Sequence, residues 1–219
     1  MIEDYLNVNE FLEEHNEMSL IPHRGNGLLL KGKFKFKAKY KYYPEIEDNF
    51  KLEIIIPNNY PNEFPKIREI DKRIPRNGKF HINSNDDTLC LGSPIRLLGN
   101  IKKDISLIGF ATNCLIPFLY SASYKMRYGG KFPIGELDHG ENGILNDYCD
   151  LFDLSTHSQA KEALYLLGIK KRLANKKKCP CGCNKRLGAC KFHFKLNKFR
   201  KVVPVSWFRK HLESLGKGM

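Results

Sequence analysis

The sequence of 219 residues lacks any apolar run near the roughly 18 residues that a membrane-spanning helix requires. Its first residues, Met1 to Asp4, lack the basic and apolar segments of a secretory signal peptide, and no internal repeat is visible. We therefore expect a cytoplasmic protein with no membrane span. The length is enough for one domain of about 150 residues and a smaller module.

Acidic residues are almost absent from the last part of the chain. Residues 1–160 contain 20 Lys/Arg and 22 Asp/Glu, whereas residues 161–219 contain 17 and 2. The net charge of +13 therefore comes from the tail, where we expect any contact with nucleic acid or an acidic protein surface. The change in composition predicts a boundary near Thr156, between a domain of residues 1–155 and a module of residues 156–219.

One short segment is suited to thiol chemistry. Cys90 follows His81 and Asn83 across a loop rich in turn residues. A nucleophilic cysteine must be accessible, and acyl transfer needs a donor aimed at the oxygen that becomes negative. Cys90 is therefore the candidate nucleophile, Asn83 the candidate donor and His81 the nearest candidate base.

The residues before this segment predict an antiparallel meander. Between residues 28 and 43, six lysines alternate with mostly apolar residues, which is the period of a strand with one packed face. We interpret the lysines as a solvated sheet face and not as a nucleic-acid site. Further elements are predicted as follows: a helix at 9–16, strands at 50–56 and 66–70, an irregular segment at 71–100, a helix at 104–125 interrupted by Pro117, a loop at 129–150 containing His139, and a helix at 157–175 capped by Thr156 and Gln159.

Residues 1 to about 130 resemble the ubiquitin-conjugating enzymes. A Tyr-Pro-x-x-x-Pro turn at 60–65, a His-x-Asn element at 81–83 and a Cys-Leu step at 90–91 occur in the order of that family's core. The resemblance implies an α+β fold, a meander sheet with flanking helices, and a cysteine that carries a ubiquitin-like protein as a thioester. It also implies that Asn83 stabilises the oxyanion formed when an amine attacks. His81 is either the base or a residue that shapes the loop.

The departures from the family pattern indicate a subgroup. The spacing to the cysteine is one residue shorter, and the Trp-Ser-Pro after it is reduced to Gly92-Ser93-Pro94. With Gly-Glu-x-x-His-Gly-x-x-Gly at 135–143, the chain is similar to bacterial conjugating-enzyme-like proteins of CBASS antiphage operons. This implies a CD-NTase-type nucleotidyltransferase as partner, its C-terminus or a ubiquitin-like protein as cargo, and an activating enzyme supplied in trans.

Four of the seven cysteines lie within twelve residues of the tail, which in a cytosolic protein favours a metal site over disulfides. The segment resembles the zinc motif at the carboxyl end of SecA, called SEC-C. The resemblance implies a structural zinc ion bound by Cys179, Cys181, Cys190 and His193, with Cys183 as a competing fourth ligand. Cys114 and Cys149 are expected to be structural.

The leading hypothesis is a conjugating transferase that uses Cys90. The alternatives are a non-catalytic binding module of the same fold, and a nucleic-acid-binding protein that uses the tail. In the tail, basic residues are interleaved with Phe192, Phe194 and Phe199, which suits phosphate contact and base stacking. A zinc knuckle with solubilising basic residues fits the same pattern.

Overall fold

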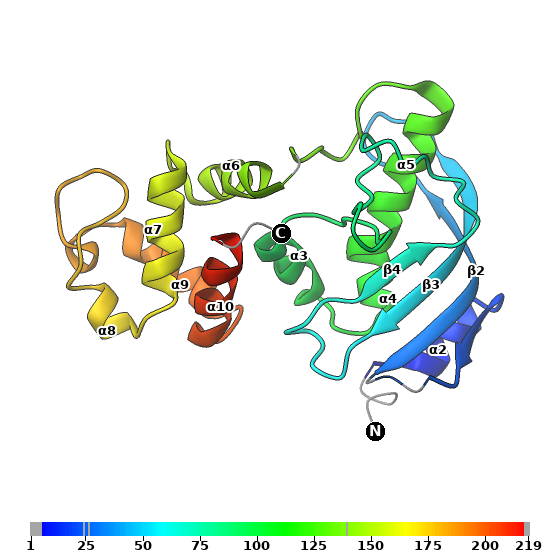
Figure 1. Cartoon of the computed structure of the whole chain (residues 1–219), viewed down its shortest axis with the longest axis horizontal. Helices are drawn as coiled ribbons and strands as arrows, with labels where there is room; N and C mark the ends of the chain where they lie inside the picture. The colour runs from blue at the N-terminus through cyan, green and yellow to red at the C-terminus, as the bar shows by residue number, and fades with distance from the viewer. Residues whose placement is uncertain (1–5, 24, 26, 139, 217–219) are drawn as a thin grey trace. The chain divides into compact units, whose positions relative to one another are not determined.

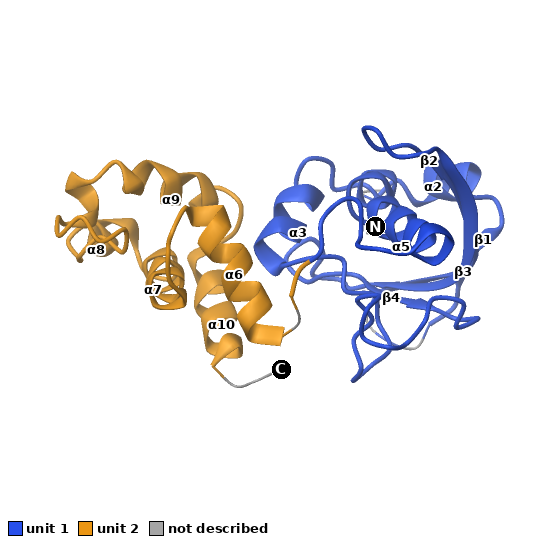
Figure 2. Ribbon diagram, turned by 90° about the horizontal axis from the view of Figure 1, so that it is seen from above, with its two compact units in different colours: residues 1–136 blue, residues 137–219 orange. Residues whose placement is uncertain are grey.

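A computed structural model describes residues 6–23, 25, 27–138 and 140–216 of the chain. They form an α+β protein that divides into two compact units, residues 1–136 and 137–219 (Figures 1 and 2). The boundary lies before the predicted one at 155/156. The reason is that α6 (Gly140–Phe152), in a segment predicted to be a loop, is a helix that packs on α7 (His157–Leu167).

The sheet of the first unit is a four-stranded antiparallel meander with the strand order β1-β2-β3-β4. Strands β2 and β3 pair along their whole lengths, from Leu28 opposite Ile56 to Ala38 opposite Ile46. The predicted meander is confirmed, but its first strand is not predicted, because only Met18 of that strand is buried. The strands are β1 (Met18–Ile21), β2 (Leu28–Ala38), β3 (Ile46–Ile56) and β4 (Lys66–Glu69).

The alternating pattern of β2 sorts its side chains between two environments. Phe34 and Phe36 are buried in the core, while the lysines that alternate with them, Lys33, Lys35 and Lys37, are exposed. Those lysines pair with glutamates, as in the contact of 2.9 Å between Lys37 Nζ and Glu45 Oε1. The interpretation of the lysine row as a solvated sheet face is therefore confirmed.

One face of the sheet is covered by a long helical run (Figure 1). It begins as α4 (Leu107–Phe110), passes through a π-helical turn at Ala111–Leu115 and continues as α5 (Ile116–Tyr128). Pro117 has no N–H, so an ordinary α-helix would leave a carbonyl without a partner one turn earlier. The π-helical turn is wider than an α-helical turn and lies just before the proline. In it, Ile116 N–H donates to Ala111 C=O, five residues earlier.

The run Leu107–Tyr128 is also long and apolar enough, by length and composition, to cross a membrane. However, 67% of its apolar window is buried inside the protein. That burial is what the core helix of a folded domain shows. In the described part of this unit the remaining helices are α2 (Val8–Glu14) and α3 (Pro94–Ile101), the second of which lies in the segment predicted to be irregular.

The second unit is built around α7. Its N-terminus carries the predicted capping box, in which Thr156 Oγ1 accepts from Gln159 N–H and the Gln159 side chain accepts from Thr156 N–H. The helix ends at Leu167 and does not continue to residue 175, and Arg200 donates to the carbonyls exposed at this end. The other elements are α8 (Lys171–Ala174), a 3₁₀ turn at Leu187–Ala189, α9 (Phe192–Arg200) and α10 (Val205–Leu215).

A buried histidine makes this helical unit sensitive to acid. His211 is 9% exposed, and its Nε2 lies 2.7 Å from the hydroxyl of Tyr148. Burial lowers the pKa of His211 from 6.5 to about 4. Between these pH values the unfolded chain binds a proton that the folded chain does not, so the free energy of unfolding falls as the pH falls through this window.

We expect the unit to lose about 2 kcal/mol of stability between pH 7.5 and pH 5 from this histidine alone. The fluorescence of Trp207, the only tryptophan, follows urea unfolding of this unit, since its ring stacks on His211 at 5.0 Å. In the His211→Gln variant the decrease between the two pH values should be smaller by that amount. Equal slopes for both proteins would show that another group controls the acid sensitivity.

Candidate functional site

The predicted nucleophile lies in a small β-hairpin formed by residues 81–90. Cys90 N–H donates to His81 C=O at 2.8 Å, Ile82 and Leu89 form a β-bridge, and Asn83 N–H donates to Thr88 C=O at 2.8 Å. The hairpin therefore places Cys90 opposite His81 and brings the three predicted catalytic residues onto one element.

This hairpin is joined to the free edge of β4. Leu89 N–H donates to Ile67 C=O at 2.8 Å, and Arg68 Nε donates to Asp86 C=O at 2.9 Å. Arg76 adds a second link. Its Nε lies 2.9 Å from Asp87 Oδ1 in the hairpin turn, and its Nη1 lies 2.8 Å from the buried carboxylate of Glu69 on β4. The sheet thus holds the loop in one place, which a catalytic residue on a loop requires.

The amide of Asn83 is oriented by its neighbours in the turn. Its Nδ2 donates to Thr88 Oγ1 at 2.9 Å, and Thr88 Oγ1 donates to Asp86 Oδ1 at 2.6 Å. The bond from Thr88 lowers the pKa of the Asp86 carboxyl. Nδ2 carries two hydrogens, so one N–H of Asn83 remains for a substrate oxygen.

His81 is buried at 7% exposure and has a left-handed backbone with a φ of 53°. Its Nε2 lies 3.5 Å from Glu136 Oε1, and the same carboxylate oxygen accepts from Lys125 Nζ at 2.6 Å. Burial acts to raise the pKa of Glu136, but Lys125 and His81 outweigh it and lower that pKa. Sequence reasoning did not identify Glu136 or Lys125 as site residues, because their approach to His81 depends on tertiary folding.

The thiol of Cys90 is half-buried. Burial raises its pKa above the ordinary value of 9.0, and the Gly92 backbone N–H acts in the opposite direction. Burial therefore favours the neutral thiol of Cys90 over its thiolate in the free protein.

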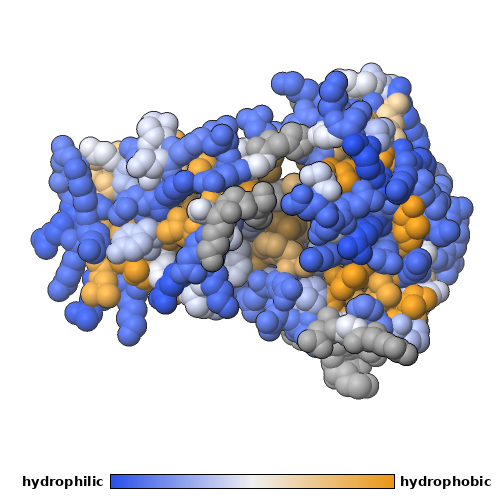
Figure 3. Space-filling model, viewed as in Figure 1, coloured by the Kyte–Doolittle hydropathy of each residue, from blue (hydrophilic) through white to orange (hydrophobic). Residues whose placement is uncertain are grey.

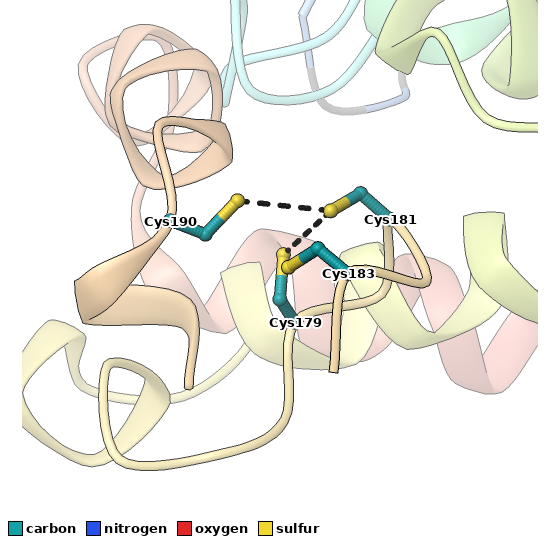
Figure 4. A group of neighbouring side chains, drawn as sticks. All are labelled: Cys179, Cys181, Cys183 and Cys190. Carbon is teal, nitrogen blue, oxygen red and sulfur yellow. Dashed lines mark hydrogen bonds between the residues drawn. The ribbon is translucent and has the colours of Figure 1, made fainter. Parts of the chain in front are cut away.

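The cysteines of the tail converge on one point, as Figure 4 shows. The sulfurs of Cys179, Cys181, Cys183 and Cys190 all lie within 4.8 Å of one another. Zinc–sulfur bonds of about 2.3 Å in a tetrahedron place the sulfurs about 3.8 Å apart. The distances of 3.2 Å from Cys179 to Cys181 and 3.7 Å from Cys181 to Cys190 are close to that spacing. This cluster could hold a metal ion such as zinc.

The surroundings of the cluster suit thiolate ligands. Phe192 N–H points at Cys190 Sγ from 3.4 Å, and backbone N–H groups that donate to a sulfur stabilise its charged form. The Lys185 N–H lowers the pKa of the Cys183 thiol to about 7, whereas burial raises the pKa of Cys179.

The sequence favoured His193 over Cys183 as the fourth metal ligand, and the geometry of the cluster favours Cys183 instead. His193 is not in the group of converging ligand atoms, and its Nδ1 donates to Cys190 C=O at 2.7 Å. Gly182 has a left-handed backbone with a φ of 82°, and the chain turns there so that the sulfur of Cys183 lies near that of Cys179 instead. The dense Cys-x-Cys-x-Cys run at 179–183 was the sequence signal for this arrangement.

Two other cysteines and one histidine were considered in the sequence. Cys114 is in the core of the first unit, where burial raises the pKa of its thiol to about 12. Cys149 is half-buried on α6. His139, considered as a site residue, lies outside the described residues.

The fold and the cluster define the class of protein in coarse terms: an α+β protein with a four-stranded antiparallel meander and a C-terminal four-cysteine cluster able to bind a metal. Comparisons of the chain with models of protein families, with curated proteins and with solved structures found no match.

Proposed function

We propose that this protein is a ubiquitin-conjugating-type transferase in which Cys90 carries an activated C-terminus as a thioester. The observation that supports the proposal is the 81–90 hairpin. It presents a half-buried cysteine at the edge of an antiparallel meander and places Asn83 and His81 on the arm that pairs with it. The motif order in the sequence is that of the conjugating enzymes.

The proposed reaction has two steps. The Cys90 thiolate attacks the thioester of an activated donor, and the donor's former thiol leaves as a thiolate. An amine of the acceptor then attacks the new thioester, and Cys90 leaves as a thiolate while the amine loses a proton. Both steps pass through an oxyanion, and the remaining N–H of Asn83 donates to the one that forms when the amine attacks the thioester.

The contacts of His81 favour a positioning role over a base role. Its carbonyl holds the N–H of Cys90, and its ring faces the carboxylate of Glu136. Since burial raises the pKa of Cys90, we propose that the donor and its enzyme promote deprotonation when they bind.

The pathway we propose is bacterial antiphage defence of the CBASS type, in the cytoplasm. The cargo is the C-terminus of a CD-NTase-type nucleotidyltransferase or a ubiquitin-like protein, and an activating enzyme acts in trans. Two observations support this pathway: the departure of the 81–94 segment from the ordinary conjugating-enzyme pattern, and the Gly-Glu-x-x-His-Gly-x-x-Gly motif at 135–143. A neighbouring gene for such a nucleotidyltransferase would support the pathway, and its absence would contradict it.

The raised pKa of Cys90 also favours a second candidate, a binding module that has the fold but no transfer activity. The two candidates differ in one observable property. A transferase forms a covalent adduct that thiols release, whereas a binding module forms none.

We expect Asn83→Ala to slow discharge to an amine by about 10²- to 10³-fold and to slow loading much less. Single-turnover assays of the two half-reactions measure this difference. The matched control is Thr88→Val, which removes the partner of the Asn83 amide but keeps the amide itself. If both variants lose the same activity in both steps, Asn83 only holds the hairpin together.

A further inference from the structure

The second unit contains a stretch of chain that has no acidic residue. From position 163 to 212 there are fifteen Lys/Arg residues and no Asp/Glu. Four thiolates and one Zn²⁺ in the cysteine cluster would contribute a charge of only about −2. The stretch therefore keeps a large positive charge with or without the metal.

Three of these cations have structural roles. Arg209 donates to Gly168 C=O, just after the end of α7. Lys195 pairs with Asp153, and Arg200 donates to the carbonyls at the end of α7. The other twelve are exposed, and within the described residues none of them forms an ion pair. This is unlike β2, whose lysines are matched by glutamates.

Helix α9 presents part of this charge as an ordered stripe. Lys191, Phe194, Lys198 and Lys201 are spaced by three, four and three residues, which places them on one helical face, and all four are exposed. The opposite face packs inward through buried Leu196 and through Phe199, whose ring meets that of Phe152 at 5.1 Å. The stripe is therefore held rigidly with its side chains outward.

An exposed aromatic platform lies in the middle of the stripe. Phe194 is 62% exposed, and its ring lies 3.9 Å from that of His193. Among the described residues Phe194 is the only phenylalanine with an exposed side chain, and lysines flank it on the same helical face. In Figure 3 the outer surface over α8 and its neighbours is mostly hydrophilic, with small hydrophobic patches among the polar side chains.

The cysteine cluster fixes a second basic segment beside the start of α9. Cys179 N–H donates to Lys185 C=O, and Lys178 and Arg186 form a β-bridge, so residues 178–186 form a narrow ribbon. Cys190, which directly precedes the stripe, joins this ribbon through the sulfur contacts (Figure 4). Cations on the ribbon and on the stripe are thus presented by one rigid knuckle.

We propose that this knuckle binds single-stranded nucleic acid. The exposed lysines contact successive phosphates, and a base stacks on the Phe194 ring, in the combination that sequence-tolerant single-strand binders use. An acidic protein would match the charge but would give the exposed ring no planar partner. A duplex would hide its bases from the ring.

The test uses the full chain loaded with zinc and a fluorescein-labelled oligouridylate of about 20 nucleotides, followed by anisotropy at several salt concentrations. We expect Phe194→Ala to weaken binding about 10-fold with an unchanged salt dependence, and Phe194→Tyr to retain binding. Lys191→Gln, Lys198→Gln and Lys201→Gln together should reduce the slope of log K against log salt by about 2.

The matched control is the triple change of Lys33, Lys35 and Lys37 to Gln, which removes the same charge from the exposed face of β2 and should leave binding unchanged. A duplex of equal length and polyglutamate serve as competitors. Weak competition by both supports the proposal. The proposal is overturned if the oligouridylate does not bind, if Phe194→Ala binds as well as the parent protein, or if polyglutamate or duplex competes equally.

Discussion

Cys90→Ser should abolish transfer of the cargo to an amine while the protein remains folded. Serine differs from cysteine by one atom, and the hairpin is held by backbone bonds that the substitution keeps. A hydroxyl without a strong base is a poor nucleophile, and any ester that forms on it resists aminolysis. The measurement is the appearance of conjugated product in a reaction containing the activating enzyme, the donor and an amine.

The matched control is Cys149→Ser, which removes a half-buried thiol from the second unit. It should retain full transfer. Equal transfer by Cys90→Ser and the parent protein would remove Cys90 from the mechanism, and equal loss in both variants would indicate general damage to the protein.

Removal of the metal from the four-cysteine cluster should have the second largest effect. We expect one zinc ion per chain, bound by four thiolates, and structural zinc contributes about 10 to 16 kcal/mol to the folding of small modules. The segment from Lys176 to Arg200 has few buried apolar residues, among them Leu187 and Leu196. Chelation should therefore loosen this segment, measured by hydrogen exchange, while residues 6–136 stay protected.

Variants of the individual ligands identify the fourth one. Cys179→Ser and Cys183→Ser should both lose zinc, measured by elemental analysis, whereas His193→Gln should retain it. Loss of zinc from the His193 variant and retention in the Cys183 variant would restore the ligand set that the sequence suggested. A protein purified without chelator that contains no metal would show that the cysteines are redox thiols.

Local pattern was enough to predict most of the sheet. Lysine and phenylalanine alternate strictly from Lys33 to Phe36. A β-strand is the only regular structure that would bury both aromatic rings of this segment on one face. The hairpin turn at Asp86 and Asp87 could not be assigned with the same certainty. Its conformation depends on Arg68 and Arg76, which are adjacent to it only after β4 has formed.

Helix α6 shows how the prediction of a loop failed. Gly140 and Gly143 interrupt the start of the segment, and glycine weakens an isolated helix. However, Leu145, Tyr148 and Phe152 are spaced by three and four residues and are all buried against the rest of the helical unit. Tertiary packing therefore outweighed the local preference, and that spacing was the signal that could have revealed the helix.

The two candidate sites differ in how close together their residues lie in the sequence. The cysteine cluster is almost entirely local, so its position was predicted and only the choice between Cys183 and His193 required coordinates. The surroundings of Cys90 are not local, since Glu136 reaches His81 from 55 positions further along the chain. A periodic pattern in the sequence cannot predict a contact between residues so far apart along the chain.

The most direct test of the proposed transferase is the intact mass of the protein after incubation with a synthetic thioester. A peptide with the C-terminal sequence of a CD-NTase-type nucleotidyltransferase, prepared as its mercaptoethanesulfonate thioester, bypasses the activating enzyme. The account predicts an adduct on Cys90 equal to the donor less the small thiol, released by dithiothreitol and absent from Cys90→Ala. An adduct that persists in Cys90→Ala, or no adduct on the parent protein, would contradict it.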